Sequence, residues 1–388
     1  MKFAYIKQGK LYYSDGQQAA MQIESQYAQD VVNNALARQQ KNSWKTGGDS
    51  AAAMMARQSM GMQGGQAVKV DVSAITSGSN ADELLYVVAT DAVGGLFSYS
   101  LSKQKETRIF HKEQLHLSDF RRNPSKDVIA CSQRAANGTA TISVVQGNDI
   151  SQVTEGDSSD EAPSWVQNND KQLVYQSAGI ARNQQGFMMG LGPSAIMKLD
   201  LQNGTVSALL ENEGYDYLSP HMTAKGELFY IKRPYEAIFK RNYPLHKMAL
   251  DALLFPFRLI RAFFDFLNFF SMAFSKKPLT TAGGPKLEGP DEKTLLLKGK
   301  LIDAEAALKE NNGSEDALRL VPSSWQLSSR DSLGKEQTLA EGVLAYDLSK
   351  DGKIVYSTGA ALYECNSDGS QKKLLSLEKF VDTILILD

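Results

Sequence analysis

The sequence has little cysteine, little histidine and almost no net charge. Its 388 residues include two cysteines and four histidines, and 42 Lys and Arg nearly balance 44 Asp and Glu, for a net charge of -2. Cys131 and Cys365 stand far apart, so no paired spacing indicates a zinc site or a disulfide framework. The balanced charge excludes a general attraction to nucleic acid or to an anionic membrane, and such contacts would need a local patch.

Catalytic motifs are also missing. The sequence has no Gly-x-Ser-x-Gly elbow, no phosphate-binding Gly-x-x-x-x-Gly-Lys loop and no His-Glu-x-x-His helix. The Gly-rich stretches at 61–66 and 190–194 lack the following helix and Lys that phosphate binding needs, so we interpret both as loops. No two histidines have the spacing of a ligand pair; they are His111, His116, His221 and His246. We therefore predict no catalytic residues, no cofactor and no metal.

Basic residues give no signal for nucleic acid. Arg121-Arg122 and Lys372-Lys373 are isolated pairs without interleaved aromatic residues. The first sixteen residues lack the apolar run of a secretory signal and instead alternate in polarity, which is typical of a strand and turn. We predict no nucleic-acid partner and a cytoplasmic location.

Repeated strand patterns run through most of the chain. An Asn203-Gly204 turn separates the apolar runs 196–201 and 206–210, which is a strong hairpin signal. Val128 and Leu173 occupy equivalent strands 45 positions apart, the spacing of a four-stranded propeller blade. The pattern repeats upstream and downstream. The C-terminal strand at 381–388 joins three N-terminal strands to form one more four-stranded blade, which brings the number of blades to six. The sequence thus predicts an all-β fold, a six-bladed β-propeller closed by strands from both termini, with residues 1–388 as one propeller and an inserted α-helical segment.

The segments Ser-Lys-Asp-Gly-Lys-Ile-Val-Tyr-Ser at 349–357 and Ala-Pro-Ser-Trp at 162–165 resemble the TolB-like (WD-repeat-like) six-bladed β-propeller family. The resemblance covers about two thirds of the chain and implies a fold rather than a function. Members include periplasmic Tol-Pal partners and propeller domains of prolyl oligopeptidases; this sequence shows neither a signal peptide nor an appended hydrolase domain. The alternative fold is a β-sandwich with accidental spacing.

Two insertions interrupt the repeats. The first, 26–66, begins with a predicted helix over about 26–42 that starts near Ser25 or Gln26. A stretch rich in Gly, Ala, Met and Gln follows, and it suits either an adaptable docking surface or a loop over one end of the propeller. The second insertion, 237–318, falls between the second and third strands of the fifth blade.

The second insertion carries the strongest functional signal. Eight of the sixteen phenylalanines lie between 255 and 274, and at helical spacing the polar residues gather into a narrow stripe. We predict that residues 245–277 anchor the protein to a membrane or a partner. The anchoring residues are Phe255, Phe257, Arg258, Leu259, Ile260, Arg261, Phe263, Phe264, Phe266, Leu267, Phe269, Phe270 and Phe274.

Four destinations compete for this segment. A membrane-spanning helix would have to hide two arginines and two aspartates. Burial in the protein's own core would need a covering element, for which a helix over 295–310 is the best candidate. An in-plane interfacial helix would place its Phe-rich face at the acyl boundary and five flanking cations near anionic headgroups, namely Lys240, Arg241, Lys247, Lys276 and Lys277. A hydrophobic groove on a partner protein is the fourth destination.

These features favour a non-enzymatic cytoplasmic scaffold that binds proteins through a propeller face and docks on a membrane surface or membrane protein. One alternative is a metal-dependent hydrolase at the propeller channel, built on carboxylates near the starts of inner strands. These are Asp119, Asp160, Asp216, Asp347 and Asp382, which in propellers more often fix strand connections. The other alternative is an obligate subunit that inserts the Phe-rich helix into a partner.

Overall fold

The structure, a computed structural model, describes residues 1–16, 19–34, 37, 70–90, 93–113, 115–123, 125–236, 294–297, 300–303 and 319–387. The chain divides into two compact units, and the described strands belong to the unit formed by Met1–Val31, Lys69–Ala237 and Lys293–Asp388. The predicted anchoring segment 245–277, with all thirteen anchoring residues, lies outside the described residues.

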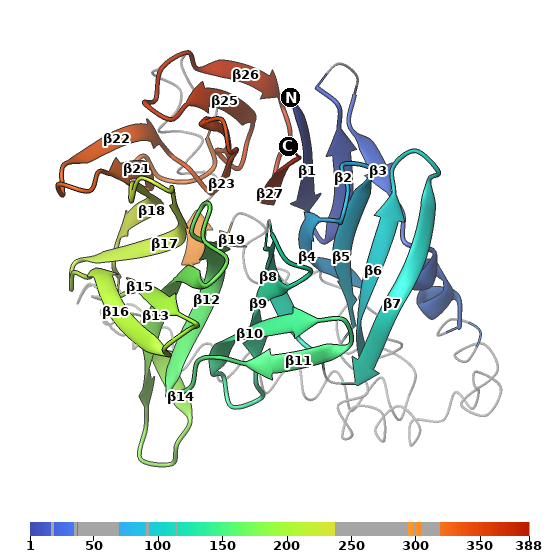
Figure 1. The fold of residues 1–388 in the computed structure, drawn as a ribbon, viewed down its shortest axis with the longest axis horizontal. Coiled ribbons are helices and arrows are strands. Elements are labelled where there is room, and N and C mark those ends of the chain that lie inside the picture. Colours follow the sequence, from blue (N-terminus) through green and yellow to red (C-terminus); the bar gives the residue numbers. More distant parts are fainter. Residues whose placement is uncertain are drawn as a thin grey trace, which may run out of the picture. The chain divides into compact units, whose positions relative to one another are not determined.

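The two ends of the chain share one four-stranded sheet (Figure 1). Its strands, in spatial order, are β27 (Val381–Leu387), β1 (Lys2–Lys7), β2 (Lys10–Ser14) and β3 (Met21–Ile23). β1 and β27 pair antiparallel, with Phe3 opposite Ile386 and Tyr5 opposite Ile384. The predicted pairing of terminal strands is thereby confirmed.

The other large sheets repeat the same antiparallel order. One holds β4 (Asp71–Ser77), β5 (Glu83–Ala89), β6 (Val93–Ser100) and β7 (Lys105–Glu113). Another holds β17 (Tyr215–Met222), β18 (Leu228–Pro234), β21 (Gln326–Arg330) and β22 (Glu336–Glu341). A third holds β23 (Ala345–Leu348), β24 (Lys353–Ser357), β25 (Leu362–Asn366) and β26 (Lys373–Ser376).

A nine-stranded sheet contains two further antiparallel groups. The first has β8 (Leu117–Arg122), β9 (Ile129–Arg134), β10 (Ala140–Gln146) and β11 (Asp149–Gln152). The second has β12 (Ser158–Trp165), β13 (Gln172–Arg182), β14 (Met188–Leu191), β15 (Ala195–Asp200) and β16 (Thr205–Leu210). One parallel residue pair, Ala140 with Ser159, joins the two groups. The fold is therefore a mostly-β propeller, and closure with six blades stays a prediction.

Neighbouring sheets bury apolar side chains against each other. Ile6 and Leu11 of the first sheet pack with Leu84, Tyr86 and Phe97 of the β4–β7 sheet. Within the described residues the helix over 26–34 adds to this region, because the Tyr27 ring lies 5.0 Å from Phe97. Ser25 caps this helix: its hydroxyl accepts a hydrogen bond from the Ala28 amide at 3.2 Å.

The chain leaves the β17–β22 sheet after β18 and returns at β21. These strands pair directly, with Leu228 opposite Arg330. The helix predicted over 295–310 is wrong at its start, where β19 (Thr294–Leu297) and β20 (Lys300–Asp303) form an antiparallel hairpin. The sequence between these strands contains Gly299, and glycine in a helix interior is unfavourable, which is the physical reason against a helix here.

Candidate functional site

A cavity of about 60 Å³ is lined by segments of six strands, and each strand stands first in its sheet or group. The segments come from β4, β8, β12, β17, β23 and β27. Three of them contain a non-glycine residue with positive φ at a register shift: Asp119 (φ 53), Ala162 (φ 50) and Ser219 (φ 51). Each is a β-bulge, and bulges redirect the side chains that follow them.

The bulges bring together a buried charged cluster formed by Arg121, His221, Tyr346 and Asp347. Asp347 is the centre: its Oδ1 lies 3.0 Å from Arg121 Nη1 and 3.2 Å from His221 Nε2, while its Oδ2 accepts a 2.7 Å bond from the Ile386 amide. The Tyr346 hydroxyl donates to the Ser219 carbonyl at 2.8 Å and lies 3.2 Å from His221 Nδ1. The cluster thus ties β8, β17, β23 and β27 together.

Burial and charge set the ionisation of this cluster. Burial alone would raise the pKa of Asp347, but the Arg121 charge, the His221 ring and the Ile386 amide outweigh it, and the pKa lies below its ordinary 3.8. For His221 burial dominates and lowers the pKa below its ordinary 6.5, although Asp347 acts in the opposite direction. Near pH 7 the cluster holds one carboxylate, one guanidinium and a neutral imidazole.

We expect acid to weaken the fold through His221. Because its pKa is lowered on folding, the unfolded chain takes up a proton more readily, so stability is full above pH 6.5 and falls as the pH drops below that value. The slope is at most about 1.4 kcal/mol per pH unit. Urea unfolding measured from about pH 8 to pH 5 checks this. His221→Gln should flatten the slope, and an unchanged slope in that variant would contradict the assignment.

A second cavity, about 240 Å³, lies on the other side of the cluster. Arg121, Ser164 and His221 line both cavities, and Asp347 lines the second. The cluster therefore separates two spaces instead of facing one open channel. Asp347 and Tyr346 bond to the backbone, whereas His221 Nε2 approaches Asp347 without forming a hydrogen bond.

Of the other predicted channel carboxylates, Asp119 and Asp382 line the first cavity, whereas Asp160 and Asp216 line neither cavity. Asp160 accepts a 2.6 Å bond from the Ser177 hydroxyl, and Asp216 accepts from the Ser194 amide and from Arg233 at 3.1 and 2.9 Å. Asp119 accepts from the Ser132 hydroxyl at 3.0 Å. Within the described part of the chain, no group of three or more His, Cys, Asp or Glu side chains could hold a metal ion. These aspartates join neighbouring segments, as the alternative interpretation of them predicts.

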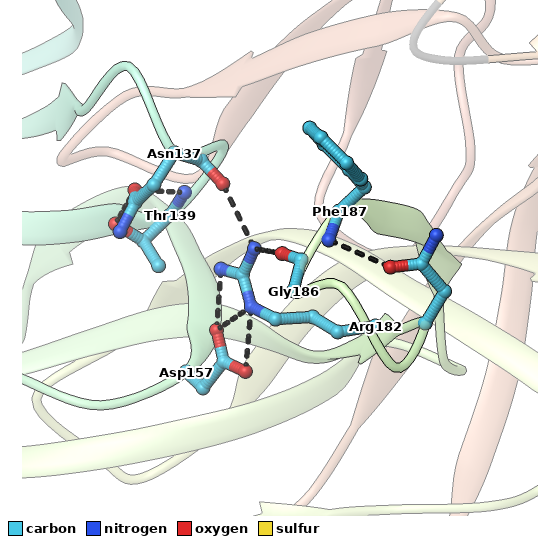
Figure 2. Close-up of polar contacts among 7 residues, drawn as sticks. Asn137, Thr139, Asp157, Arg182, Gly186 and Phe187 are labelled. Atoms are coloured by element: carbon cyan, nitrogen blue, oxygen red, sulfur yellow. Dashed lines mark hydrogen bonds and ion pairs between the residues drawn. The ribbon is translucent and has the colours of Figure 1, made fainter.

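The hairpin formed by β13 and β14 is not predicted from the sequence. The first two residues of the segment 190–194, which is predicted to be a loop, belong to β14. β13 continues past Ser177 and pairs with β14 (Figure 1). At the turn, Arg182 bonds to Asp157 and to the Asn137 and Gly186 carbonyls, while Phe187 projects away (Figure 2). The sequence pattern of β14 is weak because its exposed apolar residues face no core. Polarity along the strand therefore does not alternate as it would in a half-buried strand.

Comparison with known proteins supports the fold. The sequence matches no protein-family model and no curated protein sequence. TolB from Acinetobacter baumannii is similar in structure, with a TM-score of 0.50 and 13% identity over 99% of this chain and 66% of that chain. A chain of the nidogen/laminin complex gives 0.51 and 7% over 100% and 98%, and the tricorn protease gives 0.44 and 9% over 98% and 33%. The chain has a TolB-like β-propeller fold.

Proposed function

We propose that this protein is a β-propeller scaffold that binds a protein partner on a propeller face and is held at a membrane surface or membrane protein by residues 245–277. One observation supports the scaffold most directly: the charged side chains between the inner strands neutralise each other. Asp347 lies between Arg121 and His221, and Asp216 pairs with Arg233. Such groups stiffen the structure that presents the outer loops. One of the structurally similar chains was itself crystallised in a protein complex.

The membrane half of the proposal rests on the sequence of the second insertion. Eight phenylalanines between 255 and 274, flanked by lysines on both sides, match an interfacial helix that binds through apolar burial and attraction to anionic headgroups. We place the protein on the cytoplasmic side of a membrane. Among the described residues, no helix is both long and apolar enough to cross a bilayer.

Liposome flotation tests the membrane anchor. We expect the full chain to float with vesicles of phosphatidylcholine and phosphatidylglycerol, and a variant lacking 244–278 to remain in the dense fraction. A full-length variant with Phe263→Ser, Phe266→Ser and Phe270→Ser should also stay unbound, because each buried Phe contributes about 1.5–3 kcal/mol. Leu333→Ser with Leu377→Ser is the matched control, since these leucines are 92% and 65% exposed and lie elsewhere.

Salt separates the two contributions to binding. Flotation that persists at high salt would show that the phenylalanines dominate over the lysines. If neither the full chain nor the deletion variant floats while both stay folded, the membrane anchor is wrong. Pull-down of a protein partner by the full chain but not by the deletion variant would then support the obligate-subunit alternative.

A further inference from the structure

The turn of the β13–β14 hairpin exposes an apolar tip formed by Phe187, Met188 and Met189. Their side chains are 68%, 39% and 40% exposed. No charged residue occurs from 183 to 197. Large exposed apolar residues grouped in one place mark a contact surface, whereas single ones do not. Leu333, in the turn between β21 and β22, is also strongly exposed. It lies between Asp331 and Lys335, so its surroundings are charged and differ from those of the tip.

Four of the five backbone amides from 183 to 187 donate hydrogen bonds within the turn. The Asn183 side-chain oxygen accepts from the Gln185 and Phe187 amides at 3.0 and 2.9 Å, and the Asn183 amide donates to the Phe187 carbonyl at 3.0 Å. The Gly186 amide donates to Asn183 at 2.9 Å, and the Gly186 carbonyl accepts from Arg182 Nη1 at 3.0 Å. A loop at a bilayer interface gains from internal bonding of its backbone groups, and these bonds supply part of it, with the exposed Gln184 and Gln185 at the turn itself.

Arg182 holds the turn in place from its base. Its Nε and Nη2 donate to Asp157 at 2.8 and 2.6 Å, and Nη1 also donates to the Asn137 carbonyl at 3.1 Å (Figure 2). The guanidinium is thereby neutralised below the tip, where it adds no charge to the apolar surface. A fixed tip loses little conformational entropy when it binds.

The hairpin also lies beside the start of the second insertion. The Tyr235 hydroxyl donates to the carbonyl of Leu191, the last residue of β14, at 2.8 Å. Glu236, the next residue, is the last described one before the second insertion. Leu191 is four residues from Phe187, or about 13 Å along a strand. The last described residues before the second insertion thus lie near the base of this hairpin.

We propose that Phe187, Met188 and Met189 form a second membrane contact that enters the interface of a phospholipid bilayer. The inference rests on the proposed membrane docking. A bilayer interface fits the tip because Phe187, Met188 and Met189 carry no charge and four of the five amides from 183 to 187 are already bonded, while the exposed Gln184 and Gln185 side chains suit the headgroup region. Stable attachment commonly needs two anchors, and the tip supplies an uncharged one whose contribution does not depend on salt.

A fluorophore at position 187 tests this contact. The two native cysteines are buried, and burial raises the thiol pKa of Cys131 and that of Cys365, the latter to about 11, so a single exposed cysteine can be labelled selectively. Full-length F187C carrying an NBD group should brighten and shift to the blue when phosphatidylcholine and phosphatidylglycerol vesicles are added. L333C with the same label is the control and should not change.

Unlabelled variants measure the strength of the contact. Phe187→Ser with Met189→Ser in the full chain should weaken vesicle binding at least about tenfold, and equally at low and high salt. Unchanged binding would overturn the inference. Loss of vesicle binding at low salt only would also overturn it.

The outcomes separate the two proposals. If the full chain floats but NBD at 187 does not respond, the tip contact is wrong and the anchor at 245–277 stands. If the chain does not float and NBD does not respond, both fail. If NBD is already blue-shifted without vesicles and the shift disappears on dilution, a second copy of the chain covers the tip, and the lipid contact is overturned.

Discussion

Replacing Asp347 by alanine is expected to destabilise the protein by about 3–5 kcal/mol, because a buried ion pair that loses one partner leaves an uncompensated charge. The Asp347 carboxylate is 4% exposed and is the common partner of Arg121, His221 and the Ile386 amide. Its removal would leave the Arg121 guanidinium facing a neutral ring and an unbonded amide. Urea unfolding at pH 7 measures the change.

Asparagine at the same position separates charge from hydrogen bonding. Asp347→Asn keeps an acceptor for the Ile386 amide and should cost less, about 1–3 kcal/mol. Asp127→Asn is the matched control: its side chain is 83% exposed and pairs with Arg122 at 3.1 Å, so the change should cost under about 1 kcal/mol. Equal losses in the free energy of unfolding at positions 347 and 127 would show that the buried cluster stabilises the protein no more than an exposed ion pair does.

Arg233→Ala should give a second loss of about 3–5 kcal/mol. Arg233 and Asp216 face each other across β17 and β18, with side chains only 9% and 7% exposed and Nε 2.9 Å from Oδ2. The guanidinium also lies 4.7 Å from the Trp325 ring, just before β21. Alanine would remove this contact and leave the Asp216 carboxylate buried without its guanidinium, although the Ser194 amide would still donate to it at 3.1 Å.

Tryptophan fluorescence, to which Trp325 contributes together with Trp44 and Trp165, follows the urea unfolding of the same variant. Arg233→Lys should recover part of the stability, since lysine keeps the charge but not the planar fork. Arg134→Ala is the control, because Arg134 is 52% exposed in its pair with Glu161 and should matter little. A lysine variant no better than alanine would argue that packing on Trp325, and not charge, is what stabilises this site.

Local sequence signals predicted much of the sheet structure. The Asn203-Gly204 pair lies in the loop between β15 and β16, where Asp200 pairs with Thr205 and Gly204 adopts φ 69. The pairing of β27 with β1 followed from counting repeats, because one blade lacked a strand that only the far terminus could supply. Residues 294–303 form a hairpin, although Leu and Lys have high helix propensity and favour a helix there. The glycine in this segment opposes a helix.

Two features escaped prediction for different reasons. The apolar tip at 187–189 belongs to a hairpin whose exposed side chains carry no core-facing pattern, so the sequence reads as a loop. The sequence shows Arg121 as one of a basic pair, His221 as an isolated histidine and Asp347 as an aspartate near the start of a strand. Nothing local joins them, since they lie on strands of three different sheets.

The sequence by itself determined most of the strands, their turns and the antiparallel order within each sheet, because period-two patterning and turn residues act over a few neighbours. The tertiary structure alone decided which side chains meet between the sheets. Three bulges turn Asp119, Ala162 and Ser219 out of register, and a shift of one residue reverses the face on which the following side chain lies. The buried charged cluster depends on those shifts and on contacts between residues more than a hundred positions apart, which no local pattern encodes.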